Sequence, residues 1–254
     1  MAEIEVRAAR FSGDRHQAGM TLLLHLGPGV LFVVAALPLA RLAAERGLPP
    51  AFGLQAAALL VLVPVQLGTI SLAARLSTGS WQLRGALRYT TRLPRRQLLL
   101  LGTATLVWAG IMFALVGPSA EMIRSSLFAW WPTELDYAAH LTDPNAYPQQ
   151  MLIAAWVSGL IATTIIVPVV EELYFRSFLL PRLEHLGALA PLVNTVLFAA
   201  YHVWSPWQVP TRIVASLPLF YATWRTRSVT LAIVVHVALN LIGDTLASIP
   251  IVFR

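Results

Sequence analysis

The sequence predicts an all-α protein: a polytopic bundle of transmembrane helices with about seven spans, or eight if a loop or C-terminal segment re-enters the membrane. Hydrophobic residues make up 57% of the 254 residues and charged residues only 12%. An ordinary soluble domain carries about twice that share of charge. Apolar stretches near the ~20 residues that cross a bilayer recur along the chain. Because the hydrocarbon core admits only helices or closed barrels, we expect every span to be helical.

Seven apolar stretches account for this prediction. In chain order they are Met20–Ala40, Ala51–Ala74, Leu98–Val116, Met151–Arg182, Ala188–Trp204, Thr211–Trp224 and Val229–Leu246. No internal repeat, linker or second domain interrupts them. We therefore expect residues 1–254 to form a single integral membrane domain.

The charges between the spans predict the orientation. The segment Arg75–Gln97 holds six arginines and no acidic residue, which is typical of a cytoplasmic loop. The segment Gly117–Gln150 holds one arginine among four acidic residues and belongs on the opposite side. Residues 1–19 are polar and lack the order of a cleaved signal peptide, so we expect a cytoplasmic tail.

The net charge of +6 is explained by these loops, and no nucleic-acid partner is expected. All eighteen basic residues are arginine. Together with abundant alanine and leucine, this bias suggests a GC-rich bacterial genome, and hence a bacterial inner membrane.

The fourth stretch contains the charged residues whose insertion into a membrane costs the most free energy. Glu171, Glu172 and Arg176 lie in an otherwise apolar segment, where each charge costs roughly 2.5 to 3.5 kcal/mol on insertion scales. In an α-helix, Glu172 and Arg176 are one turn apart and can form an ion pair. Glu171 points elsewhere and requires a partner from another helix. Pro168 removes a backbone hydrogen bond towards Thr164 and allows a kink.

Three more polar groups fall inside the later stretches. His202 lies in the fifth, while His236 and Asn240 share a helix face in the seventh. A lone intramembrane histidine most simply makes an interhelical hydrogen bond. Several such groups at similar depth predict a polar cavity. Two other polar residues are interpreted as structural. His25 lies beside Gly27-Pro28-Gly29, where we expect a loosened helix, and Asp244 lies near the C-terminal end.

These residues carry a resemblance. The pattern Glu171-Glu172-x-x-x-Arg176, then Phe198-x-x-x-His202, then His236-x-x-x-Asn240 resembles the three-motif signature of the CPBP family. That family includes CAAX-type prenyl endopeptidases and bacteriocin-processing or abortive-infection proteins. The resemblance covers about Ala154 to Gly243 and implies a glutamate-type intramembrane protease. Residues 151–246 would be its catalytic core, and its substrate a protein or peptide in the lipid bilayer.

The resemblance agrees with the chemistry that the residues offer. Glu171, assisted by His202, is expected to activate water for attack on a peptide carbonyl. His236 and Asn240 can donate hydrogen bonds to the resulting oxyanion, and we expect them on the opposite wall of the cavity. Glu172 and Arg176 are expected to be supporting residues, and Phe198 to line the cavity.

Three alternatives stay open at this stage. Glu171, His202 and His236 could hold a catalytic zinc, although the His-Glu-x-x-His pattern is absent and we expect no cofactor. The chain has no cysteine, which excludes thiolate catalysis. The polar residues could instead stabilise a non-catalytic immunity or scaffold protein, or serve a small transporter. The absence of a visible inverted repeat disfavours the transporter.

Overall fold

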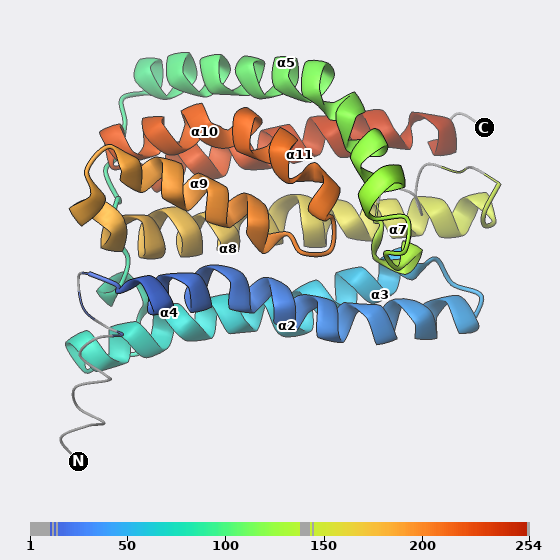
Figure 1. The fold of residues 1–254 in the computed structure, drawn as a ribbon, viewed down its shortest axis with the longest axis horizontal. Coiled ribbons are helices and arrows are strands. Elements are labelled where there is room, and N and C mark those ends of the chain that lie inside the picture. The colour runs from blue at the N-terminus through green and yellow to red at the C-terminus, as the bar shows by residue number, and fades with distance from the viewer. Residues whose placement is uncertain (1–10, 12, 14, 138–142, 144, 253–254) are drawn as a thin grey trace.

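In the computed structural model, all residues are described except 1–10, 12, 14, 138–142, 144 and 253–254. Most of the expected N-terminal tail therefore lies outside the described residues. The described chain runs back and forth as seven helical segments packed side by side (Figure 1). The segments are α2 (Ala18–Glu45); α3 (Pro50–Ala57), a π-helical Ala58–Leu62 and α4 (Val63–Thr78); α5 (Arg95–Leu127); α7 (Gln149–Ile161), a π-helical Ala162–Ile166, α8 (Val167–Glu171), a π-helical Glu172–Leu179 and a 3₁₀-helical Leu180–Leu186; α9 (Leu189–Tyr201); α10 (Val209–Thr226); and α11 (Val229–Val252).

The predicted fold class is confirmed. Five of the seven segments are long and apolar enough to cross a membrane: Ala18–Glu45, Pro50–Thr78, Arg95–Leu127, Gln149–Leu186 and Val229–Val252. The apolar helix α9 is shorter, with 13 residues, and α10 does not meet the same criteria. Within the described part of the chain, β structure is limited to an isolated bridge between Thr90 and Ser228. The protein is therefore an all-α, polytopic membrane bundle.

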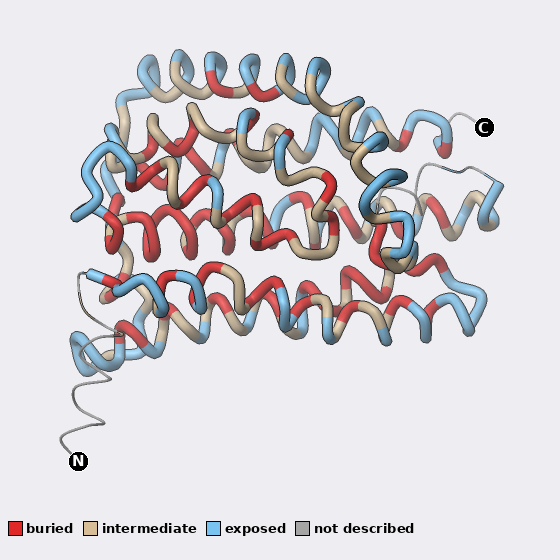
Figure 2. The backbone as a smooth tube through the Cα atoms, viewed as in Figure 1, coloured by how far each residue is buried: buried red, intermediate tan, exposed pale blue. Residues whose placement is uncertain are grey.

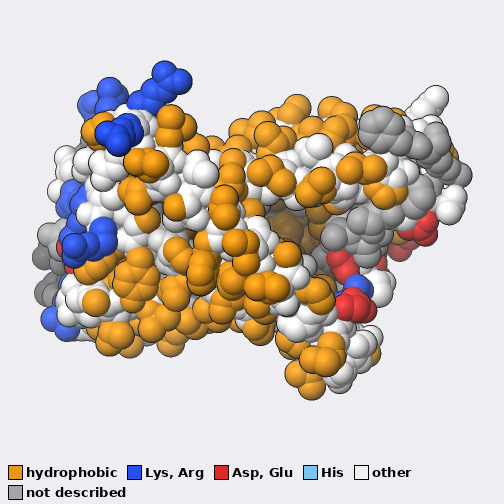
Figure 3. Space-filling model, turned by 90° about the horizontal axis from the view of Figure 1, so that it is seen from above, with side chains coloured by type: hydrophobic (Ala, Val, Ile, Leu, Met, Phe, Trp, Pro, Cys, Tyr) orange, Lys and Arg blue, Asp and Glu red, His pale blue; other side chains and the backbone are white. Residues whose placement is uncertain are grey.

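The charged side chains separate along the bundle. The α4–α5 and α10–α11 connections lie at one end, and the α2–α3 connection lies at the other (Figure 1). Figure 3 shows arginines gathered at one end of the molecule and acidic side chains near the other, with hydrophobic side chains between them. This is the distribution that a membrane-spanning bundle requires, because the middle must face lipid.

Buried residues concentrate where α2, α8 and α9 meet, whereas α5 is largely exposed (Figure 2). Within α5, only Thr105 and Ala109 are buried. Pro118 lies inside this helix, and α5 changes direction towards its C-terminal part (Figure 1). A proline that removes a backbone hydrogen bond is the usual cause of such a bend.

The glycines of α2 set its distance from α9. The expectation of a loosened helix near Gly27 and Gly29 is wrong, because α2 is continuous from Ala18 to Glu45. A Cβ atom added at Gly29 would lie 2.0 Å from the backbone oxygen of Tyr201. Gly29 therefore allows the backbones of α2 and α9 to approach closely. His25 supports the same interface, since its Nε2 lies 2.9 Å from Nδ2 of Asn194.

We expect Gly29→Ala to lower the thermal stability of the protein in detergent, by about 1–3 kcal/mol, because the methyl group must displace α9. Gly27→Ala is the matched control. The nearest atom to its new Cβ, Cδ1 of Leu23, lies at 3.9 Å, so no displacement is required. Equal melting temperatures for the two variants would contradict this account of the interface.

Candidate active site

One cavity of about 360 Å³ collects the polar residues singled out from the sequence. Its lining comes from several helices, including α5, α8, α9, α10 and α11. Six of the seven predicted residues line it: Glu171, Arg176, Phe198, His202, His236 and Asn240. The seventh, Glu172, is fully buried and bonds to two of them. The structure therefore brings six of the seven residues together around one cavity, and the roles of all seven remain predictions.

The backbone that carries the glutamates is not a regular α-helix. The π-helical segments Ala162–Ile166 and Glu172–Leu179 flank the short α8, which contains Pro168. The prediction assumed α-helical geometry, and it is wrong in this detail. A π-helical turn holds an extra residue and occurs often at functional sites. Pro168 cannot donate a backbone hydrogen bond, which favours such a local change of winding.

Glu172 and Arg176 form the predicted ion pair. Nε of Arg176 lies 2.8 Å from Oε2 of Glu172, and both side chains are almost completely buried. The guanidinium is sandwiched between two phenyl rings, with its Cζ atom 4.0 Å from the ring centroid of Phe198 and 3.8 Å from that of Phe220. Nε and Nη1 of Arg176 are buried and make no hydrogen bond with any described residue. Electrostatic attraction and ring stacking thus hold Arg176.

The other oxygen of Glu172 holds His236. Nδ1 of His236 lies 2.6 Å from Oε1 of Glu172. Because a carboxylate accepts hydrogen bonds, Nδ1 carries the proton and donates. The remaining ring nitrogen, Nε2, lies 3.9 Å from Oε2 of Glu171. Glu172 therefore orients both Arg176 and His236.

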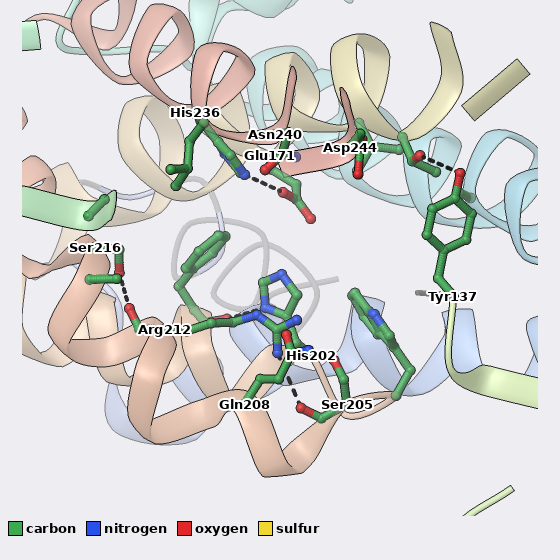
Figure 4. A pocket seen from close by; sticks show the side chains of 18 of the residues that line it. Tyr137, Glu171, His202, Ser205, Gln208, Arg212, Ser216, His236, Asn240 and Asp244 are labelled. Carbon is green, nitrogen blue, oxygen red and sulfur yellow. Dashed lines mark hydrogen bonds and ion pairs between the residues drawn. The ribbon is translucent and has the colours of Figure 1, made fainter. Parts of the chain in front are cut away.

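Glu171 is fixed by a residue that the sequence analysis missed. The hydroxyl of Tyr201 donates to Oε1 of Glu171 at 2.8 Å, and Nε2 of Gln66 donates to that hydroxyl at 3.3 Å. The second oxygen, Oε2, faces the cavity and His236 (Figure 4). The sequence gives only weak signals for these two residues. Gln66 is a polar residue in an apolar span, and Tyr201 is adjacent to His202.

His202 lies across the cavity from Glu171 (Figure 4). It follows the last residue of α9, and its Nδ1 donates to the carbonyl oxygen of Phe198 at 2.8 Å. This bond leaves Nε2 for other partners. His236 and Asn240 lie on the same side as Glu171, so the prediction that they form the opposite wall is wrong. The physical reason is the bond from His236 to Glu172, which draws α11 against the glutamates.

Two further charged residues line the cavity. Asp244 was expected to lie near the C-terminal end and to be structural. It accepts a hydrogen bond from Thr164 and also lines the cavity. Arg212, in the first turn of α10, lies beside His202 on the wall facing Glu171 (Figure 4). Arg212 was not among the predicted site residues, although it lies at the edge of the apolar stretch Thr211–Trp224, and a charge beside apolar residues is the same kind of signal that identified Glu171.

The cavity residues do not assemble the alternative zinc site. Among the described residues, no three His, Asp or Glu side chains lie close enough together to hold a metal ion. Glu171, His202 and His236 occupy two sides of the cavity instead of one tetrahedral set. The arrangement offers one carboxylate and two imidazoles around a space, which suits acid–base chemistry on a molecule bound between them.

Figure 3 shows that the face seen from above is hollowed near its middle and that hydrophobic side chains surround the hollow. Part of the lining of the cavity comes from the exposed helix α5, through Thr105, Ala109 and Phe113. The site is thus bounded on one side by a helix with few buried residues.

Comparison with protein families gives one match. Residues 151–242 match the family described as type II CAAX prenyl endopeptidase Rce1-like. This range contains all seven predicted site residues, confirms the resemblance found from the motifs and supports protease activity at the level of the family. It covers less than half of the chain. No curated protein sequence and no solved structure matches the chain.

We expect Arg176→Ala to destabilise the protein by about 3–5 kcal/mol, because it leaves the buried carboxylate of Glu172 without its cation. Arg41→Ala is the control. Nε of Arg41 lies 3.0 Å from Oε1 of Glu134, but the pair is solvent-exposed and is worth about 0–1 kcal/mol. Melting in detergent measures both. An Arg176→Ala protein as stable as Arg41→Ala would show that the buried pair does not support the fold.

Proposed function

We propose that this protein is an intramembrane endopeptidase that hydrolyses peptide bonds of membrane-associated proteins with a water molecule activated by Glu171. The observation that carries the proposal is the different environment of the two oxygens of that carboxylate. One oxygen is held by Tyr201, and the other faces a cavity with two imidazole rings. The family match over residues 151–242 supports the same conclusion.

The first step uses the two facing walls. A water molecule between Oε2 of Glu171 and Nε2 of His202 would lose a proton to Glu171 as its oxygen attacks the substrate carbonyl. Glu171 then returns the proton to the leaving amine, so that the carboxylate is regenerated.

The attack places negative charge on the carbonyl oxygen, and His236 and Asn240 are the proposed donors to it. The amide of Asn240 can donate without any change of protonation. Nδ1 of His236 is already used for Glu172, so Nε2 donates only when the ring carries both protons. Glu172, Arg176 and Phe198 act indirectly, by holding His236 and the walls of the cavity in place.

We further propose that residues 1–254 act as one integral membrane domain, with residues 151–246 as its catalytic core. The arginine-rich end and the N-terminus would face the cytoplasm of a bacterial cell, within the inner membrane. The hollow among hydrophobic side chains supports lateral entry of a protein or peptide from the bilayer (Figure 3). We propose no nucleic-acid partner.

Removal of the base tests the function. We expect Glu171→Gln to reduce cleavage by about 100- to 10,000-fold while the protein stays folded, because an amide cannot accept the proton from water. New peptide termini in membranes that contain the protein, identified by mass spectrometry, measure the cleavage. Asp244→Asn removes a carboxylate elsewhere in the same cavity and should leave cleavage intact. Unchanged termini in Glu171→Gln, with a loss of stability, would support a scaffold instead.

The proposed mechanism uses no metal. We expect EDTA and 1,10-phenanthroline to leave cleavage unchanged, because protein side chains alone supply the base and the donors. Loss of activity in chelator that zinc restores would overturn the metal-free mechanism but not the protease.

A further inference from the structure

Among the described residues, Arg212 has no ion-pair partner. Its guanidinium lines the cavity on the wall facing Glu171 (Figure 4). Nη1 of Arg212 donates to the backbone oxygen of Ser205 at 3.2 Å. No carboxylate of the described residues lies within 4.0 Å of its nitrogens, whereas Nε of Arg176 has Glu172 at 2.8 Å. A guanidinium has five N–H donors, and within the described part of the chain the contact with Ser205 is the one hydrogen bond that the Arg212 side chain makes.

The helix that carries Arg212 adds to the positive potential. Arg212 lies at the start of α10, where the helix dipole is positive, and the first turn contains no acidic residue. Arginine is disfavoured in this position unless an anion is present. Gln208, immediately before α10, also lines the cavity, and its side chain does not cap the helix. The wall of the cavity that contains Arg212 therefore has a positive electrostatic potential, which favours the binding of an anion.

A purely structural role does not explain this arrangement. Glu171, across the cavity, acts on Arg212 electrostatically, but the two side chains form no ion pair. Glu171 does not pair with Arg212, because one of its oxygens accepts from Tyr201 and the other faces the cavity on the side of His236. A structural arginine at this depth would resemble Arg176, paired and stacked between rings, because an unpaired charge in low dielectric is costly.

We propose that Arg212 binds a carboxylate of the substrate and thereby selects which peptides enter the site. This inference rests on the proposed protease function. Arginine recognises carboxylates through two parallel hydrogen bonds, which fixes both position and direction of the bound group. The carboxylate has two possible sources, the free C-terminus of the substrate or an acidic side chain near the cleaved bond. In either case, Arg212 orients the peptide between Glu171 and His202.

Four matched sets of apolar peptides test the proposal. They carry a free or an amidated C-terminus, each with or without one glutamate. The full-length protein in lipid nanodiscs is incubated with each set, and cleavage is followed by mass spectrometry. We expect peptides with a carboxylate to be cleaved at least about tenfold faster than peptides without one. In Arg212→Gln this preference should disappear, and in Arg212→Lys it should fall to an intermediate value.

Arg225→Gln is the matched control, because Arg225 lies at the exposed end of the same helix. It should keep the preference of the unmodified protein. A preference confined to free C-termini identifies the terminal carboxylate, and one confined to glutamate identifies the side chain. Equal cleavage of all four sets, or a preference that survives in Arg212→Gln, would overturn the inference.

Binding separates this inference from the proposed function. The same peptides are tested for thermal stabilisation of Glu171→Gln and of Glu171→Gln/Arg212→Gln, in which cleavage plays no part. Stronger stabilisation by carboxylate peptides, lost in the double variant, supports Arg212 as a carboxylate-binding residue. If this result occurs while the unmodified protein cleaves no peptide, the protease function fails and the binding site remains. No carboxylate preference in binding overturns the inference.

Discussion

The carboxylate of Glu172 determines the geometry of the candidate site. One of its oxygens contacts Arg176 and the other accepts a hydrogen bond from His236. Both partners are needed, because a buried carboxylate with an unused oxygen would retain much of its desolvation cost. Arg176 is in turn enclosed by aromatic rings from α9 and α10. Glu172 lines no part of the cavity, yet through these contacts it connects the π-helical segment Glu172–Leu179 with α9, α10 and α11.

The neighbouring glutamate has the opposite environment. Glu171 adjoins Glu172 in the chain, yet among the described residues it accepts a single hydrogen bond, from Tyr201, and its other oxygen faces the cavity. Two adjacent carboxylates can therefore serve two purposes, one for assembly and one for chemistry. The separation arises from helix winding, since consecutive residues point in directions far apart around the axis.

The sequence was sufficient for features with a local cause. The helical segments follow from runs of apolar residues, and the pair between Glu172 and Arg176 follows from their spacing. The partners of Glu171 and the arrangement of the walls could not be predicted, because they depend on how separate helices pack. Tyr201 reaches Glu171 only after α9 has docked, and Arg212 faces the cavity only because α10 begins beside it. The π-helical winding near Pro168 also has no unambiguous signature in the sequence.

The contact between Gly29 and Tyr201 has a consequence for how this protein can be divided. Tyr201 positions Glu171, yet the residues that position Tyr201 include Gly29 of α2 and Gln66 of α4, both outside residues 151–242. The matched region is consequently not a portable module. A chimera that grafts it onto a foreign helical scaffold would carry all three motifs and still lack the surface against which Tyr201 rests. The N-terminal helices are therefore expected to co-evolve with the motif-bearing ones.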